Sequence, residues 1–244
     1  MGSRQAFVLF DLGETLVDLG GLVECLGRRL ATEYREIAVV ADETALLWIR
    51  RTSESLPREE GLAFVREIDV AASVLQAVLG SRSVAVTVEH AEQILRRSWD
   101  DFERRVKFCP GVSKAWLKEI GTLVAGLGIV TDGDSINVDR LIDRLGLMRY
   151  FDAIVTSEAV RAYKPNRQIY EAALKALGAE PSHSLFVSDT VLDLRGAVAV
   201  GMHTAFLPRR LLSGSVGLPA DTFRLTRPGE LIELVRSFSS TFPS

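Results

Sequence analysis

The sequence predicts an α/β fold, a Rossmann-like doubly wound parallel sheet with an α-helical domain inserted after the first strand. From residue 107 onward, short apolar segments alternate with amphipathic helical patterns, the order typical of parallel strands joined by helices. From residue 21 to 106 the periodicity is helical, with no clear strand. We therefore expect an α/β core of residues 1–17 and 107–244, and a helical domain of residues 18–106.

The first expected element is a buried strand ending at Phe10, because the run from Ala6 is short and continuously apolar. It delivers a single carboxylate, Asp11, to its carboxyl end. Gly13, Glu14 and Thr15 follow at once. The strand thus places one acidic side chain where parallel sheets bind their ligands.

We expect the inserted helical block to begin at a Gly20-Gly21 hinge. Cys109-Pro110-Gly111 is the turn at which the chain returns from this block to the α/β core. Apolar residues recur at helical spacing within it: Leu22, Leu26, Leu30 and Tyr34; Leu46 and Ile49; and Leu62, Val65, Ile68 and Ala72. We interpret the β-branched run 84–88, which could also be a strand, as the segment that leads into a helix over about 89–105.

The core is expected to continue as alternating helices and strands. The predicted helices are 112–120, 135–145, 168–177, 192–200 and a last one at 228–238. The predicted strands are 123–130, 153–156, 184–187 and 204–207. Asp11, Thr131, Lys164 and Asp189 then fall just after strands or in the loops that follow them, and they converge on one edge of the sheet.

The amino-acid composition of the chain disfavours several classes of binding partner and cellular location. The net charge of −3 gives no basic surface for nucleic acid or an anionic membrane. The longest apolar runs are too short to span a bilayer, and the first strand begins too early for a signal peptide. With only two cysteines, Cys25 and Cys109, we expect buried thiols rather than disulfides, and a cytoplasmic protein.

Motifs in a fixed order resemble those of the haloacid dehalogenase (HAD) superfamily, capped subfamily I, whose members are mostly Mg²⁺-dependent phosphatases. They are Asp11-Leu12-Gly13-Glu14-Thr15, Thr131-Asp132-Gly133, Lys164-Pro165 and the segment from Asp189 to Asp193. The resemblance covers nearly the whole core. It implies that the helical insert is a cap domain, which excludes water and selects the leaving group.

The resemblance also implies roles for individual residues. Asp11 would attack phosphorus as a nucleophile, and Thr131 and Lys164 would bind the phosphoryl group. A Mg²⁺ ion would be held by Asp11, the backbone carbonyl of Gly13 and Asp189, with Asp193 reaching it through water.

Gly13 departs from the family pattern, which has a second Asp at this position for proton transfer. General acid–base help is worth roughly 10² to 10⁴ in rate, and glycine supplies none. Another carboxylate such as Glu14, Asp18 or Glu24 could replace it. Alternatively, the substrate has a good leaving group, or turnover is not the function.

Two related chemistries are disfavoured by the sequence. Phosphonate-cleaving members use a cap lysine, and no lysine precedes Lys107. Haloacid dehalogenases work without metal and lack the Asp of the last motif, which is Asp189 here.

We therefore expect a Mg²⁺-dependent hydrolase of a small phosphorylated metabolite that acts through an aspartyl-phosphate, weakened or restricted to good leaving groups. The alternatives are an impaired HAD-fold protein that binds a phosphorylated ligand or partner, and a non-phosphatase reaction on the same scaffold. A monomer or homodimer is expected. The arginines Arg50, Arg51, Arg58 and Arg66 could contact an anionic substrate, although solvated helix faces are the commoner role.

Overall fold

The computed structural model describes residues 5–209 and 216–242. The chain divides into two compact units. The first contains the residues up to Asp18, the segment Arg58–Glu60 and the chain from Lys107 onward; the second contains Leu19–Pro57 and Gly61–Val106.

The first unit is built on a 6-stranded, fully parallel sheet with the strand order β3-β2-β1-β4-β5-β6. Its strands are β1 (Phe7–Phe10), β2 (Gly126–Thr131), β3 (Ala153–Thr156), β4 (Ser184–Ser188), β5 (His203–Phe206) and β6 (Phe223–Arg224). The strand order reverses between β1 and β4. Ligands of doubly wound sheets bind at such a reversal, outside the carboxyl ends of the strands.

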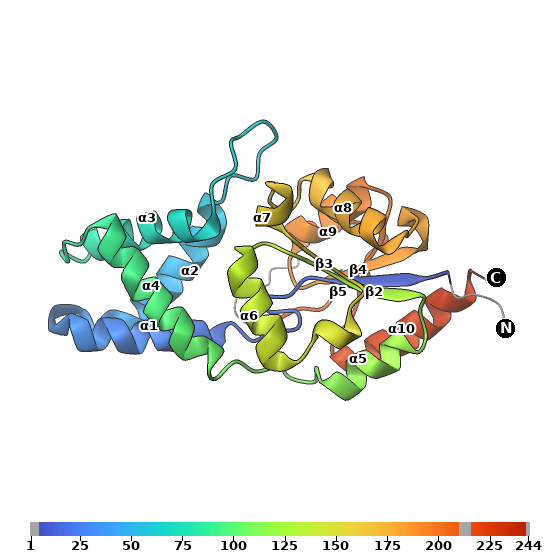
Figure 1. Cartoon of the computed structure of the whole chain (residues 1–244), viewed down its shortest axis with the longest axis horizontal. Coiled ribbons are helices and arrows are strands. Elements are labelled where there is room, and N and C mark those ends of the chain that lie inside the picture. Colours follow the sequence, from blue (N-terminus) through green and yellow to red (C-terminus); the bar gives the residue numbers. More distant parts are fainter. Residues whose placement is uncertain (1–4, 210–215, 243–244) are drawn as a thin grey trace. The chain divides into compact units, whose positions relative to one another are not determined.

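Helices cover both faces of this sheet. Those of the unit are α5 (Lys114–Gly121), α6 (Ser135–Leu145), α7 (Ser157–Val160), α8 (Arg167–Leu177), α9 (Val191–Ala199) and α10 (Pro228–Ser240), with short 3₁₀ turns η2 (Met148–Tyr150) and η3 (Pro181–His183). Figure 1 shows α8 and α9 on one face, and α5 and α10 on the other. The sequence prediction of a doubly wound α/β core is confirmed.

A tightly packed core holds the sheet against α8 and α9. Leu9 of β1 and Phe186 of β4 are fully buried there, together with Ile169 and Tyr170 of α8. The rings of Tyr170 and Phe186 meet edge to face, with centroids 5.4 Å apart, a favoured geometry for aromatic pairs. This packing fixes the strands whose carboxyl ends carry the candidate residues.

The second unit is helical. It contains α1 (Gly20–Glu33), the 3₁₀ segment η1 (Arg35–Val40), α2 (Ala41–Ser55), α3 (Glu67–Gly80) and α4 (Val88–Glu103). The expected apolar face of the first helix is confirmed, since Leu22, Leu26 and Leu30 are all buried. An ion pair of 2.5 Å between Arg29 and Asp101 joins α1 to α4. The role of this unit as a cap domain stays a prediction.

Several predicted elements match the structure closely and others do not. Helix α6 and strand β3 have the predicted bounds. The helical pattern predicted from Leu62 was wrong at its start, because Arg66 is extended (φ −62°, ψ 149°) and α3 begins only at Glu67, so that only Ile68 and Ala72 of the pattern are helical. Leu62 and Val65 are exposed as a result.

Two further differences concern strands. Strand β2 begins at Gly126, three residues later than residue 123, because the chain first turns at the end of α5, where the Leu123 amide donates to the Ile120 carbonyl. The two-residue strand β6 was not predicted. Within the described part of the chain, no helix is long and apolar enough to cross a membrane.

Candidate active site

The central strands carry the predicted site residues to one edge of the sheet. Asp11 follows β1 directly, and its amide donates to the Val187 carbonyl of β4 across 3.0 Å. Thr131 is the last residue of β2, and Asp189 follows the last residue of β4. Since β2 and β4 both pair with β1, these three positions are neighbours at the carboxyl edge.

A buried ion triad lies at this edge. The Lys164 ammonium contacts Oδ1 of Asp11 at 2.5 Å and Oδ2 of Asp193 at 2.7 Å. All three residues are buried, with Lys164 only 2% exposed. The structure therefore brings together Asp11, Lys164 and Asp193, which are far apart in the sequence.

Asp193 is held from two sides. Its Oδ2 also accepts a hydrogen bond from the Ser188 hydroxyl at 3.1 Å, and its backbone carbonyl accepts one from the Tyr170 hydroxyl at 2.8 Å. A carboxylate fixed in this way orients the Lys164 ammonium toward Asp11. The predicted contact of Asp193 with a metal through water stays a prediction.

Thr15 links Asp11 and Asp189, the two acidic residues predicted to bind a metal directly. Its hydroxyl donates to Oδ2 of Asp11 at 3.2 Å and accepts from the Asp189 amide at 3.3 Å. The Asp189 side chain accepts a hydrogen bond from the Thr190 hydroxyl at 3.2 Å. The sequence analysis gave Thr15 no role, although its place four residues after Asp11 offered a signal.

Gly13 and Glu14 lie in a tight turn after β1. The Glu14 amide donates to the Val17 carbonyl at 2.8 Å, and Glu14 has a left-handed φ of +55°. Arg209 donates to the backbone carbonyl of Glu14 at 3.2 Å. The buried Glu14 side chain lies in electrostatic range of Cys109, whose pKa is raised to about 12 mainly by burial.

Glu14 was predicted as a replacement for the missing proton-transfer residue, which would have to act beside Asp11. The charged side chains that act most strongly on Asp11 are Lys164, Asp193 and Asp189. Thus the carboxylates with the largest effect on Asp11 come from the loop after β4 and from α9, and the role of Glu14 in proton transfer stays a prediction.

Thr131 and Asp132 form the turn at the end of β2. Thr131 is buried and its hydroxyl donates to the Asp132 carbonyl at 3.1 Å. The Asp132 side chain accepts the Lys164 amide on Oδ1 at 2.9 Å. The loop that carries Lys164 is therefore tied to the end of β2, a link that sequence analysis did not foresee.

The electrostatics of the site are dominated by burial. Burial raises the pKa of Asp11 from 3.8 to about 7, the carboxylates of Asp193 and Asp189 add to this, and Lys164 opposes it. Burial alone would lower the pKa of Lys164, but Asp11, Asp193 and Asp132 together raise it well above its usual range. Lys164 is therefore a permanent cation at neutral pH.

Charge around Asp11 favours a further cation. Asp193 and Asp189 both raise the pKa of the buried Asp11, and Lys164 opposes them. Oxygen ligands of this kind suit Mg²⁺. In the side-chain arrangement described here, residues 5–209 and 216–242 present no ready-made group of three or more acidic, His or Cys metal ligands.

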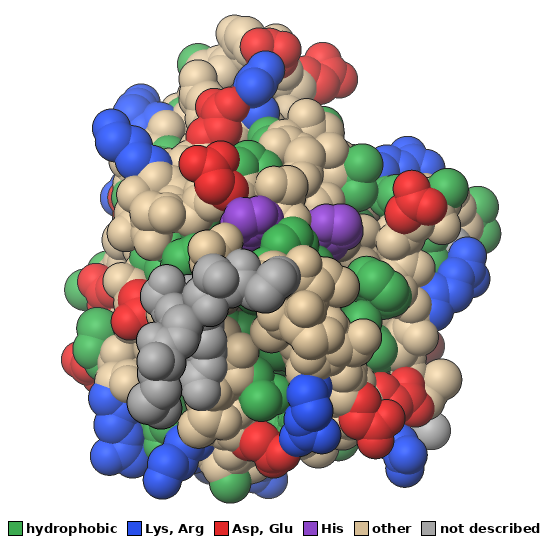
Figure 2. All heavy atoms as spheres, turned by 90° about the vertical axis from the view of Figure 1, so that its right-hand side faces the viewer, with side chains coloured by type: hydrophobic (Ala, Val, Ile, Leu, Met, Phe, Trp, Pro, Cys, Tyr) green, Lys and Arg blue, Asp and Glu red, His purple; other side chains and the backbone are tan. Residues whose placement is uncertain are grey.

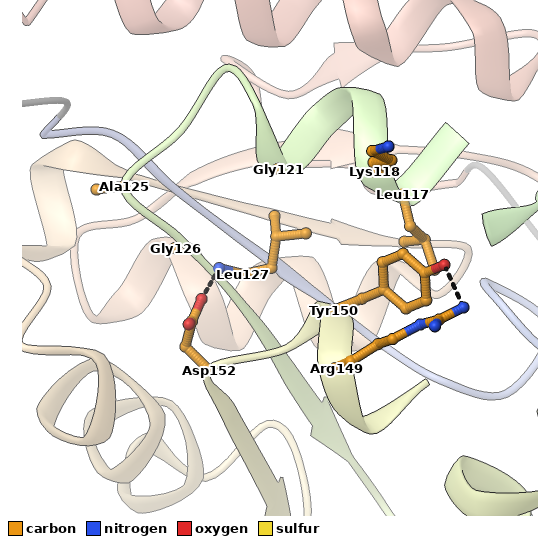
Figure 3. Close-up of a pocket in the computed structure, with 9 residues that line it drawn as sticks. All are labelled: Leu117, Lys118, Gly121, Ala125, Gly126, Leu127, Arg149, Tyr150 and Asp152. Carbon is orange, nitrogen blue, oxygen red and sulfur yellow. Dashed lines mark hydrogen bonds between the residues drawn. The ribbon is translucent and has the colours of Figure 1, made fainter. Parts of the chain in front are cut away.

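A separate pocket of about 580 Å³ opens elsewhere on the core unit (Figure 3). Arg149, Tyr150 and Asp152 line it, together with Gly126 at the start of β2. Gly126 pairs with Phe7, whereas Asp11 follows the far end of β1, about 13 Å further along at the usual strand rise. This pocket is thus at the amino edge of the sheet, away from the triad.

Surface charge gives no sign of a polyanionic partner on the face shown in Figure 2, where basic and acidic side chains are interspersed. His183 and His203 pack on aromatic rings, with centroids 4.3 Å from Phe242 and 5.1 Å from Phe238 respectively. This accounts for both histidines as packing residues.

The chain also matches known proteins. The family model described as haloacid dehalogenase-like hydrolase matches residues 8–207. The chain belongs to this family. The match spans the candidate residues from Asp11 to Asp193, together with the helical unit.

Individual relatives differ in activity. A phosphoglycolate phosphatase of Salmonella choleraesuis is 28% identical over 202 residues, covering 80% of this chain and 77% of that protein. A glyceraldehyde 3-phosphate phosphatase of Methanopyrus kandleri is 32% identical over 46% of this chain and 50% of that protein. An (S)-2-haloacid dehalogenase of a Pseudomonas species is 33% identical over 38% and 40%.

Among solved structures, L-2-haloacid dehalogenase from Xanthobacter autotrophicus has a TM-score of 0.78 at 21% identity, covering 95% of this chain and 98% of that one. At this identity the likeness shows the fold. The likeness extends over both units of the chain.

Proposed function

We propose that this hydrolase is a Mg²⁺-dependent phosphatase of a small phosphorylated metabolite, with Asp11 as the nucleophile. The observation that carries the proposal is the contact of Asp11 with the Lys164 ammonium at a sheet edge that also holds Asp189 and Thr131. The phosphatase names of relatives matched over most of their length support the same activity. Their substrates, small phosphorylated acids and aldehydes, indicate the substrate class to test.

The chemistry proceeds in two steps. An Asp11 carboxylate oxygen bonds to phosphorus while the bond from phosphorus to the leaving oxygen breaks, which gives an aspartyl-phosphate. Water then attacks that phosphorus, releasing phosphate and restoring the carboxylate. Lys164 neutralises the phosphoryl oxygens, and the Thr131 hydroxyl donates to them.

Asp11, Asp189 and the Gly13 carbonyl would hold the Mg²⁺ ion. When bound, the ion supplies positive charge that lets an anionic carboxylate approach an anionic phosphate. Asp193 keeps the Lys164 ammonium in place beside it, through the 2.7 Å contact. A cation at this position would also lower the pKa of Asp11 and keep it ionised.

Gly13 limits the substrates. A carboxylate that protonates the leaving oxygen lowers the barrier by about 3–5 kcal/mol, the equivalent of roughly 10² to 10⁴ in rate. Glycine supplies no such group, so an acyl or aryl phosphate, whose leaving group departs unprotonated, should react far faster than an alkyl phosphate. Breakdown of the aspartyl-phosphate should be slow for the same reason.

The test compares acetyl phosphate with an alkyl phosphate, using wild type, Gly13→Asp and an Asp11→Asn blank, with Mg²⁺ and with EDTA. The proposal predicts Mg²⁺-dependent turnover of acetyl phosphate, and a gain of about 10² or more on the alkyl phosphate in Gly13→Asp. Fast alkyl-phosphate turnover by wild type would assign the proton to another group, with Glu14→Gln the next variant. Turnover that survives Asp11→Asn would refute the nucleophile.

Hydrolytic dehalogenation is the second candidate, and Gly13 is the observation that favours it. A halide leaves as an anion and needs no proton, so the missing acid would cost nothing. Asp11 would displace halide from carbon to form an ester, and water would then attack the ester carbonyl. In water enriched in oxygen-18 the heavy atom would enter the Asp11 carboxylate, turnover would persist in EDTA, and the phosphatase proposal would fail.

We also propose that the protein works in the cytoplasm as a monomer or homodimer. Cys25 and Cys109 are both buried as free thiols, which suits a reducing compartment.

A further inference from the structure

Lys164 is held by its backbone as well as by its ammonium. Its amide donates to Oδ1 of Asp132 at 2.9 Å, and its carbonyl accepts a hydrogen bond from Nη1 of Arg58. Both peptide groups that flank the Lys164 side chain therefore have defined partners.

The same two partners bind each other. Nη1 of Arg58 lies 2.6 Å from Oδ2 of Asp132, so the carboxylate bridges the arginine and the Lys164 amide with one oxygen each. The two side chains are only 19% and 14% exposed. Such a partly buried ion pair is less screened than a surface pair, and charge-assisted hydrogen bonds of this kind are short and strong.

Arg58 reaches this position from a distant part of the chain. It lies between α2 and α3, and the segment Arg58–Glu60 groups with the core unit, apart from the helical residues on either side. Its guanidinium carbon lies 6.0 Å from the centre of the buried Tyr163 ring, at the outer limit of a cation–π contact. Arg58 is therefore packed beside the residue that precedes Lys164.

We propose that Arg58 is a positioning residue for the reaction: together with Asp132 it fixes the Lys164 peptide, and so the ammonium that faces Asp11. The proposal's kinetic consequence rests on the proposed phosphatase function, whereas its structural consequence does not. Removing the guanidinium would let the Lys164 backbone shift, and a displacement of about 1 Å at a catalytic group can cost up to 10²-fold in rate.

The first measurement observes Lys164 directly. The chain contains five lysines, so ¹⁵N-lysine labelling gives a simple ammonium spectrum, and the buried Lys164 should exchange its protons slowest. We expect Arg58→Gln to shift that signal and raise its exchange rate by about 10-fold or more. The matched control is Arg167→Gln. Arg167 lies only three residues after Lys164 in the sequence, and this change removes its exposed ion pair with Glu171.

The second measurement uses Mg²⁺-dependent acetyl phosphate turnover. Arg58→Gln should lower kcat by about 10-fold with KM nearly unchanged, and Arg58→Lys should recover part of the loss because its ammonium can still pair with Asp132. Adding Asp132→Asn to Arg58→Gln should cost little more than either change alone, since both act through the same peptide. Arg167→Gln should leave kcat unchanged.

An unchanged Lys164 signal in folded Arg58→Gln would overturn the proposal, as would full additivity with Asp132→Asn. If Arg58→Gln does not fold, Asp132→Asn serves alone, because its amide oxygen still accepts from the Lys164 amide while the ion pair is lost. Absence of turnover in wild type would refute the phosphatase function, but the ammonium spectrum would still decide the role of Arg58.

Discussion

Replacing Asp11 by asparagine should change the pH dependence of stability more than any other single substitution at the site. Burial raises the pKa of Asp11 from 3.8 to about 7 in the folded protein, while the unfolded chain keeps the ordinary value. The folded state therefore holds a proton that the unfolded state releases between about pH 4 and pH 7. By linkage, the contribution of Asp11 to stability is complete below pH 4 and is lost as the pH rises through 7.

The size of the effect follows from the same shift. Each pKa unit corresponds to about 1.4 kcal/mol, so a shift from 3.8 to about 7 is worth at most about 4 kcal/mol. The asparagine side chain of the Asp11→Asn variant does not ionise, so this loss would be absent. The free energy of unfolding of Asp11→Asn minus that of wild type should therefore rise by up to about 4 kcal/mol between pH 4 and pH 8.

Urea unfolding in EDTA at several pH values measures this difference, because the other ionisable groups contribute nearly equally to both proteins. The m-values of the two proteins should agree, which shows that the same transition is compared. If the difference in free energy of unfolding between the two proteins stays constant from pH 4 to pH 8, the pKa of Asp11 is not raised. Burial and the neighbouring carboxylates of Asp193 and Asp189 would then not act on Asp11 as described. Addition of Mg²⁺ should stabilise wild type at pH 8 but not Asp11→Asn.

Two further substitutions test the packing of the site. Lys164→Met should destabilise the protein by about 3–5 kcal/mol, because Asp11 and Asp193 then lose the cation between them. Denaturant unfolding at pH 7 measures this loss, which should shrink at pH 4, where Asp11 is protonated. Gly196→Ala should cost about 1–3 kcal/mol, since its added methyl group would lie 2.7 Å from the Tyr170 ring. A thermal unfolding curve unchanged by Gly196→Ala would contradict the close contact of α9 with α8.

The α/β core could be predicted because its local signals agree with one another. The α6 segment combines an amphipathic pattern with a left-handed Gly146 at its end, and α8 ends in the same way at Gly178. The region after α2 lacked such agreement. Leu62 and Val65 have helical spacing, but both are exposed and lie before the start of α3 at Glu67, and spacing alone did not reveal this.

The sequence allowed the main residues of the candidate site to be predicted, but not the hydrogen bonds and ion pairs that join them. Parallel strands must bring Asp11, Thr131 and Asp189 to one edge, so a pattern of strands suffices to group them. Nothing in the sequence places Arg58 against Lys164, 106 residues away, because that contact depends on the path of the chain between α2 and α3. Ser188 was likewise missed, because its hydroxyl matters only through the orientation of Asp193.

In the proposed reaction Asp11 accepts a phosphoryl group, and Gly13 slows its release. The most direct test mixes the protein with acetyl phosphate and Mg²⁺, quenches in acid and measures the mass of the peptide that contains Asp11. We predict that wild type accumulates one phosphoryl group on this peptide, that Gly13→Asp accumulates much less because its carboxylate activates water, and that Asp11→Asn accumulates none. Phosphate release without any phosphorylated Asp11 in wild type, or labelling that survives Asp11→Asn, would contradict the account.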